Sequence, residues 1–144
     1  MKYRIAQLAD IPGFVAIEKS QPRCAQWTAQ DWQTELADAS AYVLCACEQD
    51  QVIGFVSLRL AGGVGEILNV GVLPEVTRQG VGFMLLDAVL EQARQRGGES
   101  LTLEVGKNNA PAVKLYQKAG FKQVGVRKNF YPNNEDALIM GRTL

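Results

Sequence analysis

The chain has 144 residues, of which 47% are hydrophobic and 21% charged, an ordinary composition for a globular protein. Its 15 basic and 15 acidic residues cancel, which argues against a general affinity for nucleic acid or for an anionic membrane surface. No apolar run is long enough to span a membrane and residues 1–5 lack a signal-peptide pattern, so we expect one cytoplasmic domain over residues 1–144.

The first half of the chain is predicted to form a strand, two helices and three further strands. The first strand covers Tyr3 to Leu8, and Asp10 then caps a helix that has Pro12 in its first turn. The run Thr28-Ala29-Gln30-Asp31 is a capping box that starts the second helix, which reaches about Ala39. The next strands are expected at Ala41–Glu48, Val52–Leu60 and Glu66–Leu73.

The second half is predicted to alternate helices with strands. One helix starts at Gly80 and stops at Gly97-Gly98, and another is capped by Asn109 and stops at Gly120. The strands are expected at Leu101–Val105, Lys122–Arg127 and Ala137–Arg142. The order β-α-α-β-β-β-α-β-α-β-β mixes hairpins with crossover helices, which indicates an α+β fold. Its central sheet is expected to be mixed but mostly antiparallel, flanked by about four helices.

The stretch from Val70 to Gly82 combines a strand with a glycine-bearing turn that opens a helix. Gly71 interrupts the strand, which indicates a β-bulge or a close backbone approach by a ligand. The turn carries Arg78, and the N-terminus of the following helix offers unpaired N–H groups and a positive dipole end. Because a pyrophosphate fits such a turn, we expect a phosphate-bearing cofactor.

The chain has no histidine, which excludes Ser-His-Asp and Cys-His catalysis and removes the commonest metal ligand. No metal is therefore expected. The three cysteines, Cys24, Cys45 and Cys47, lack zinc-type spacing and are expected to pack as small hydrophobic residues. Acid–base chemistry must come from carboxylates, tyrosine, lysine or cysteine.

The turn Thr77-Arg78-Gln79-Gly80-Val81-Gly82 resembles the [Q/R]-x-x-G-x-[G/A] signature of the GNAT acetyltransferases, with Thr77 in place of Gln or Arg. The expected element order resembles the GNAT fold over essentially the whole chain. The stretches Leu103-Glu104-Val105 and Asn108-Asn109-Ala110-Pro111-Ala112, with the tail Arg127-Lys128-Asn129-Phe130-Tyr131-Pro132 and Glu135-Asp136-Ala137, resemble the RimI type of bacterial N-terminal protein acetyltransferases. P-loop and dinucleotide-binding fingerprints are absent from the sequence.

The resemblance implies an acetyl-CoA-dependent N-acetyltransferase that works by direct attack in a ternary complex. The implied acceptor is the N-terminal α-amino group of a protein or peptide, such as a ribosomal protein, with neither nucleic acid nor membrane as a partner. It also implies Glu104 as the proton acceptor and Tyr116 as the group that protonates the thiolate. The residues themselves favour Glu104, because a carboxylate between Leu103 and Val105 in a central strand is costly to bury.

The remaining candidates would hold the two substrates. The expected acetyl-CoA contacts are Val70, Gly71, Val72, Arg78, Gln79, Gly80, Val81, Gly82, Phe83 and Asn109. In this assignment the strand backbone near Val72 polarises the acetyl carbonyl and the turn takes the pyrophosphate. Trp27 and Tyr131 are expected to line the acceptor site.

Several alternatives stay open at this point. Glu104 could serve a structural hydrogen bond, Tyr116 could be a core aromatic residue, Asn109 a plain helix cap and Tyr131 a surface aromatic residue. The acceptor could instead be a small amine, such as an amino acid, a polyamine or an antibiotic. A non-catalytic acyl-CoA-binding module is favoured only by Thr77. The chain is expected to be a monomer or a homodimer.

Overall fold

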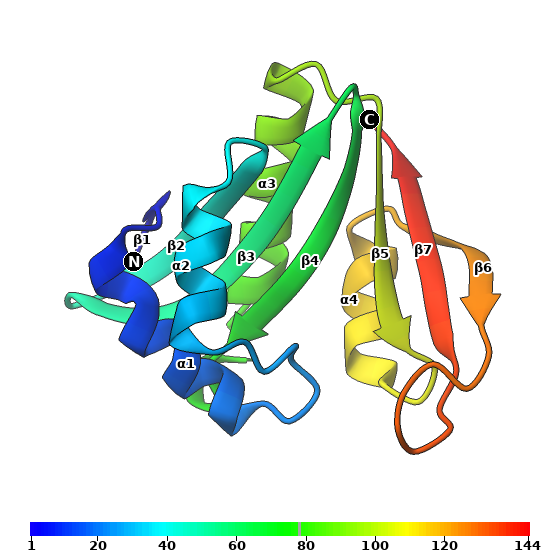
Figure 1. The fold of residues 1–144 in the computed structure, drawn as a ribbon, viewed down its shortest axis with the longest axis horizontal. Helices are drawn as coiled ribbons and strands as arrows, with labels where there is room; N and C mark the ends of the chain where they lie inside the picture. Colours follow the sequence, from blue (N-terminus) through cyan, green and yellow to red (C-terminus); the bar gives the residue numbers. More distant parts are fainter. Residues whose placement is uncertain (78) are drawn as a thin grey trace.

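One sheet is built from seven strands, which are β1 (Lys2–Ile5), β2 (Ala41–Glu48), β3 (Gln51–Ala61), β4 (Val64–Val72), β5 (Ser100–Gly106), β6 (Lys122–Arg127) and β7 (Ala137–Thr143). In the computed structural model, which describes residues 1–77 and 79–144, their spatial order is β1-β2-β3-β4-β5-β7-β6 (Figure 1). Neighbouring strands run antiparallel except β4 and β5, which are parallel. The mixed, mostly antiparallel sheet is therefore confirmed.

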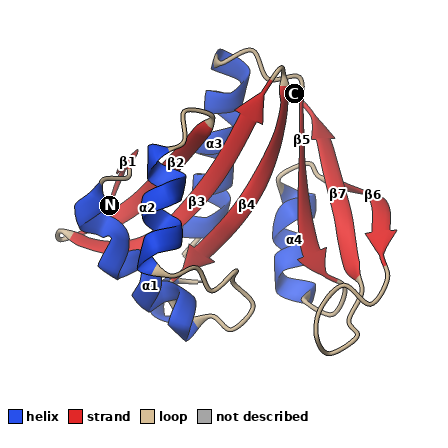
Figure 2. Cartoon of the chain, viewed as in Figure 1, coloured by secondary structure: helices blue, strands red, loops and turns tan. Residues whose placement is uncertain are grey.

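The helices are α1 (Ile11–Ser20), α2 (Ala29–Ala37), α3 (Val81–Gln95) and α4 (Ala110–Lys118), with 3-10 turns η1 (Leu8–Asp10) and η2 (Pro74–Val76). α1 and α2 cover one face of the sheet, and α3 and α4 cover the other (Figures 1 and 2). None of the helices in the described part of the chain is long and apolar enough to cross a membrane. The predicted element order is confirmed; the two 3-10 turns were not predicted.

Each face of the sheet has its own hydrophobic core. Under α1 and α2, the rings of Phe14, Trp32 and Phe55 pack against one another in tilted or edge-on arrangements, with centroid distances of 4.7 to 5.3 Å. Under α3, a stripe of buried side chains packs on the central strands, and it consists of Val81, Leu85, Leu86, Val89, Leu90 and Ala93. Because both faces are covered, β2 and β3 are apolar in near-continuous runs rather than in alternation.

Local signals in the sequence predicted several helix ends correctly. The Thr28–Asp31 capping box is present, with the Asp31 N–H donating to Thr28 Oγ1 at 3.1 Å and the Thr28 N–H donating to Asp31 Oδ2 at 2.8 Å. Gly97 and Gly120 follow α3 and α4 with φ of +82° and +91°. Residues other than glycine rarely adopt this left-handed backbone conformation, so Gly97 and Gly120 end the helices where expected.

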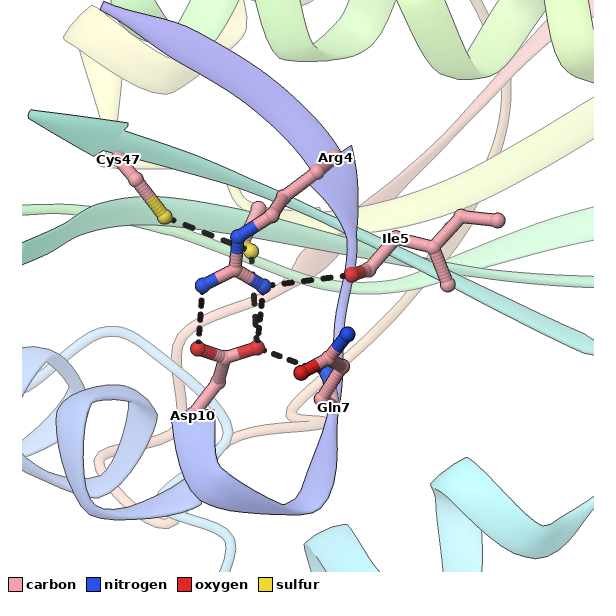
Figure 3. Close-up of polar contacts among 6 residues, drawn as sticks. Arg4, Ile5, Gln7, Asp10 and Cys47 are labelled. Atoms are coloured by element: carbon pink, nitrogen blue, oxygen red, sulfur yellow. Dashed lines mark hydrogen bonds and ion pairs between the residues drawn. The ribbon is translucent and has the colours of Figure 1, made fainter. Parts of the chain in front are cut away.

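The first strand is shorter than predicted, because Asp10 folds back on the chain that precedes it. β1 ends at Ile5, and the Asp10 carboxylate accepts the Gln7 N–H at 2.7 Å. Asp10 occupies the N-cap position of α1, as predicted, but its side chain does not cap that helix. It instead makes a two-pronged ion pair with Arg4, both N···O distances being 2.7 Å (Figure 3). The pair joins β1 to the start of α1.

This ion pair makes a testable contribution to stability. Asp10 is 6% exposed, and its bonds from Arg4 hold the pKa of the carboxyl below its ordinary value. Replacing Arg4 with Met leaves a buried, unpaired carboxylate, so we expect the free energy of unfolding to fall by about 2 kcal/mol at pH 7, less than for a fully buried pair because Arg4 is partly exposed. Urea denaturation measures this change.

The pH dependence has a definite sign. The folded protein keeps the Asp10 carboxylate charged to lower pH than the unfolded chain does. The stabilisation is therefore complete above the ordinary carboxyl pKa of about 4 and is lost as the pH falls through the pKa of the folded state. We expect Asp10→Asn to flatten this part of the stability–pH curve; an unchanged curve would contradict the assignment.

Candidate functional site

The candidate site lies where β4 and β5 part. The two strands pair from Val64 opposite Ser100 to Ile67 opposite Leu103, and their pairing ends there although both continue (Figure 1). The bulge of β4 falls at Leu68, because Ser57 pairs with Asn69 and Leu58 pairs with Ile67. Beyond this point the edge of β4 that would face β5 lies open.

Peptide groups of the predicted cofactor strand lie along this open edge. Leu73 donates its N–H to the Ile53 carbonyl on β3 at 2.9 Å. Alternate residues of an antiparallel strand point their N–H and C=O groups to opposite sides. The peptide groups of Val70 and Val72 therefore point away from β3. Consistent with this, the Val72 carbonyl accepts the Gln21 side chain at 2.9 Å and the Val70 carbonyl accepts Cys24 Sγ at 3.3 Å.

The prediction of a bulge at Gly71 is wrong. Gly71 stays in register opposite Phe55 and points its α-carbon hydrogens at the α1 face. A Cβ at this position would lie 2.6 Å from Phe55 Cζ and 3.1 Å from Ile17 Cγ2. Glycine is needed because the Phe55 ring packs directly against the backbone, and the irregularity that precedes the open edge lies at Leu68.

The glycine-bearing turn leads into α3 as predicted. Gly80 is the N-cap residue with φ of +78°, and a Cβ there would have open space around it. The first helical bond runs from the Met84 N–H to the Gly80 carbonyl at 3.0 Å, so the N–H groups of Val81, Gly82 and Phe83 precede the helical ladder. These donors suit an anionic group such as a pyrophosphate.

Gln79 and Thr77, in the same turn, offer fewer free donors to an anion. Gln79 donates its own N–H to the Val76 carbonyl at 3.1 Å, so this backbone donor is already used. Thr77 stands where the GNAT signature has a longer Gln or Arg side chain. Its hydroxyl donates to the Pro74 carbonyl at 3.1 Å, which stabilises η2. Arg78 lies outside the described residues.

The two predicted catalytic side chains come from β5 and from α4, the helix that follows it. Glu104 follows Leu103, the last residue of β5 that pairs with β4. Its carboxylate forms an ion pair with Arg127 of β6, with Oε1 3.2 Å from Nε, and it remains partly exposed. Tyr116 belongs to α4, and burial is the main cause that raises the pKa of its hydroxyl, with Cys24 and Tyr131 adding to the effect. The phenol therefore keeps its proton at neutral pH.

The two residues predicted to line the acceptor site, Trp27 and Tyr131, lie in different parts of the fold. Trp27 packs edge-on against Trp32 at 4.7 Å and donates its N–H to Glu18, so much of it serves the α1–α2 core. Tyr131 is half-buried in the β6–β7 loop. Burial raises its pKa, the charges of Glu104 and Glu135 raise it further, and Arg23 opposes them. The charge of Glu104 thus acts on Tyr131, whereas the described contacts of Trp27 are with Trp32 and Glu18.

Asn109 is the N-cap residue of α4, as predicted, but its side chain makes no capping hydrogen bond. Its backbone carbonyl accepts the Val113 N–H at 3.0 Å, so the main chain alone starts the helix. The side-chain amide of this half-buried residue therefore does not cap the helix, contrary to the interpretation of Asn109 as a plain helix cap.

The cysteines behave mainly as packing residues. Cys45 and Cys47 are buried with their sulfurs 3.8 Å apart, on one face of β2 as predicted. Burial, followed by the charge of Cys47, raises the pKa of Cys45 to about 12. Burial, with a smaller contribution from Glu18, raises that of Cys24 to about 12. Neither thiol is suited to act as a nucleophile at neutral pH.

Buried carboxylates beside the site were missed in the sequence. Glu18, which is 1% exposed, accepts the Trp27 N–H and the Asn69 side-chain amide, and burial raises its pKa. Glu135, which is 8% exposed, accepts the Asn108 N–H at 2.6 Å. Glu135 stands in the Glu135-Asp136-Ala137 run, but only the fold reveals that each carboxylate accepts from one main-chain N–H and one side chain, Asn69 for Glu18 and Arg23 for Glu135.

Comparisons with known proteins agree with this geometry. Residues 5–121 match the model of the acetyltransferase (GNAT) family. A Bacillus subtilis protein provisionally named a ribosomal protein bS18-alanine N-acetyltransferase is 32% identical over 98% of this chain and 94% of its own length. The Salmonella typhimurium ribosomal protein bS18-alanine N-acetyltransferase is 35% identical over 63% of this chain, and the alignment spans 64% of that protein.

Solved structures agree as well. The crystal structure of the ribosomal-protein-S18-alanine N-acetyltransferase from Escherichia coli superposes with a TM-score of 0.88 at 26% identity, covering 99% of this chain and 92% of that one. Ard1 from Thermoplasma volcanium superposes with a TM-score of 0.89 at 25% identity, covering 99% and 97%. The fold thus belongs to a known architecture over almost the whole chain.

The packing of Gly71 can be tested by Gly71→Ala. The added methyl group meets the Phe55 ring, so we expect a loss of about 2 kcal/mol in the free energy of unfolding. Gly141→Ala is the matched control, because a Cβ there makes ordinary contacts at 3.5 Å with Val124. Equal stabilities of the two variants would contradict the close-packing explanation.

Proposed function

Because the chain belongs to the GNAT acetyltransferase family, we propose that this N-acetyltransferase moves the acetyl group of acetyl-CoA to the N-terminal α-amino group of a protein. The observation that carries the proposal is the end of the β4–β5 pairing at Ile67 and Leu103, which leaves the peptide groups of Val70 and Val72 pointing away from β3 and puts Glu104 directly after the last paired residue of β5. We assign the proton donor to Tyr116 of α4, whose hydroxyl has a pKa raised by burial.

The residues present suit acetyl-CoA as a substrate. The open edge of β4 would offer the N–H groups of Val70 and Val72 to a pantetheine arm, which contains amide carbonyls, while Gln21 and Cys24 bond the carbonyls of these two residues. The N–H groups at the start of α3, from Val81 to Phe83, would bind the pyrophosphate. The uncommitted side-chain amide of Asn109 would add a contact to the arm.

Acetyl transfer needs a neutral amine and a protonated leaving group. An α-ammonium group has a pKa of about 8, so a base of modest strength is sufficient. Glu104 would take the proton, directly or through a water molecule. The amine nitrogen then attacks the thioester carbon, and the Val72 N–H stabilises the developing oxyanion. As the C–S bond breaks, Tyr116 would give its proton to the sulfur and later regain one from solvent.

The names of the relatives favour a protein acceptor. Proteins similar to this chain are named for the N-terminal alanine of ribosomal protein bS18, and we propose an acceptor of the same class, the free N-terminus of a ribosomal protein. Such an acceptor is found in the cytoplasm. A peptide needs an extended surface beside the reacting groups, and the β6–β7 loop with Tyr131 would supply one wall of it.

Substitution of the two reacting side chains tests the mechanism. With acetyl-CoA and an alanine-starting peptide, we expect Glu104→Gln to lower kcat by at least about 100-fold, the usual range for loss of a general base. Tyr116→Phe should lower kcat by about 10- to 100-fold with little change in acetyl-CoA affinity. Thiol release measures turnover and calorimetry measures affinity.

Glu91→Gln serves as the control, because Glu91 is an exposed residue of α3 whose ion pair is with Arg94. This variant should keep the activity of the native enzyme. Retention of full activity in Glu104→Gln would exclude the proposed base.

A second experiment tests the acceptor. We expect the native enzyme to acetylate peptides with a free N-terminal alanine at least about 100-fold more efficiently in kcat/KM than amino acids, polyamines or aminoglycosides. The N-terminally blocked form of the same peptide, with an internal lysine retained, should be inert. Turnover of the free amines but not of the peptides would overturn the protein-acceptor proposal.

A further inference from the structure

The segment from Gln21 to Cys24, between α1 and α2, links the two diverging strands of the sheet. Gln21 and Cys24 bond the Val72 and Val70 carbonyls on the open edge of β4. Between them, Arg23 reaches the other side, where its Nη1 lies 3.3 Å from both carboxylate oxygens of Glu135. Where β4 and β5 no longer bond each other, the side chains of this segment connect the edge of β4 with Glu135, in the loop before β7.

The Glu135 carboxylate bonds residues from two distant segments of the chain. Its Oε2 accepts the Asn108 N–H at 2.6 Å, just after the end of β5, and Arg23 approaches the same group. A Cβ on Gly106 would lie 2.8 Å from Glu135 Oε2 and 2.9 Å from Arg23 Nη1, so a glycine at the end of β5 is required for this approach. The bond from Asn108, together with Arg23, holds the pKa of the Glu135 carboxyl below its ordinary value although burial opposes this. The carboxylate is therefore charged at neutral pH.

The same residue fixes the loop that carries Tyr131. The Tyr131 N–H donates to the Glu135 carbonyl at 3.1 Å, and the Asn133 side chain accepts the Glu135 N–H at 3.1 Å. Tyr131 in turn lies within electrostatic reach of Glu104. Glu135 thus connects the Gln21–Cys24 segment, the end of β5 and the Tyr131 loop.

We propose that Glu135, acting through Arg23, is a positioning residue for the acceptor: it holds the Gln21–Cys24 segment and the Tyr131 loop at the spacing that admits an extended peptide N-terminus beside Glu104. This inference rests on the proposed function. The described bonds of Arg23 and Glu135 themselves involve neither the Val70 and Val72 peptide groups nor the first turn of α3, the two regions assigned to acetyl-CoA. Loss of the Arg23–Glu135 pair should therefore weaken acceptor binding and leave acetyl-CoA binding nearly unchanged.

The test compares steady-state kinetics of native enzyme, Glu135→Gln and Arg23→Met with acetyl-CoA and an alanine-starting peptide. Glutamine retains an oxygen for the Asn108 N–H but loses the charge that pairs with Arg23. We expect KM for the peptide to rise about tenfold in both variants, with kcat and KM for acetyl-CoA within about twofold of native values. The double variant should be no worse than either single one, because both remove the same interaction.

Asp136→Asn is the matched control. It removes the neighbouring charge in the same loop, and Asp136 Oδ1 bonds the Asn129 N–H at 3.0 Å rather than Arg23. We expect native peptide KM in this variant, and Arg23→Lys should recover most of the affinity that Arg23→Met loses.

The outcomes separate the two proposals. If the native enzyme acetylates no peptide, the proposed function fails. If it does so and both variants keep the native peptide KM, the positioning role fails while the proposed function stands. A parallel rise in KM for acetyl-CoA and peptide, with a lower melting temperature, would show that Glu135 serves only the stability of the fold.

Discussion

Beyond Ile67 and Leu103, β4 and β5 stop bonding each other although both strands continue, and the site depends on this separation. A strand edge in the middle of a sheet normally has its peptide groups paired, because unpaired buried N–H and C=O groups are costly. Here the groups of Val70 and Val72 need partners from elsewhere. The Gln21 and Cys24 side chains satisfy the carbonyls, and we assign the N–H groups to the proposed acetyl-CoA site.

The chemistry around this edge is built without histidine. Burial keeps protons on the Tyr116 and Tyr131 hydroxyls and on the Cys24 thiol, while Glu104 stays partly exposed beside Arg127. The side chains that keep their protons are thus the buried ones, and the carboxylate proposed as the proton acceptor is partly exposed. Carboxylates that are deeply buried, Glu18 and Glu135, are instead saturated with donors and serve to hold segments together.

Local rules predicted the elements well, and features that depend on distant contacts poorly. The capping box at Thr28 and the glycines that end α3 and α4 act within a few residues, so the sequence displays them directly. Gly71 predicts a bulge or a close backbone approach by a ligand, but the group that packs on it is the Phe55 ring of another strand. The ion pair between Arg4 and Asp10, after which β1 is shorter than predicted, and the bonds of Glu135 to Arg23 and Asn108 likewise depend on tertiary contacts. The resemblance to family positions identifies Glu104 and Tyr116 as candidates, and only the fold shows that the β4–β5 pairing ends beside Glu104.

The short parallel pairing also divides the sheet in two. The strands β1 to β4 form one antiparallel unit and β5, β7 and β6 form another, each closed largely by its own neighbours in sequence. The seam between them has few hydrogen bonds, and the core on the α3 face crosses it, where Ile67 of β4 and Leu103 of β5 belong to the same buried cluster. Side-chain packing rather than backbone pairing therefore holds the two units together, and amide exchange should be fastest where the β4–β5 pairing ends.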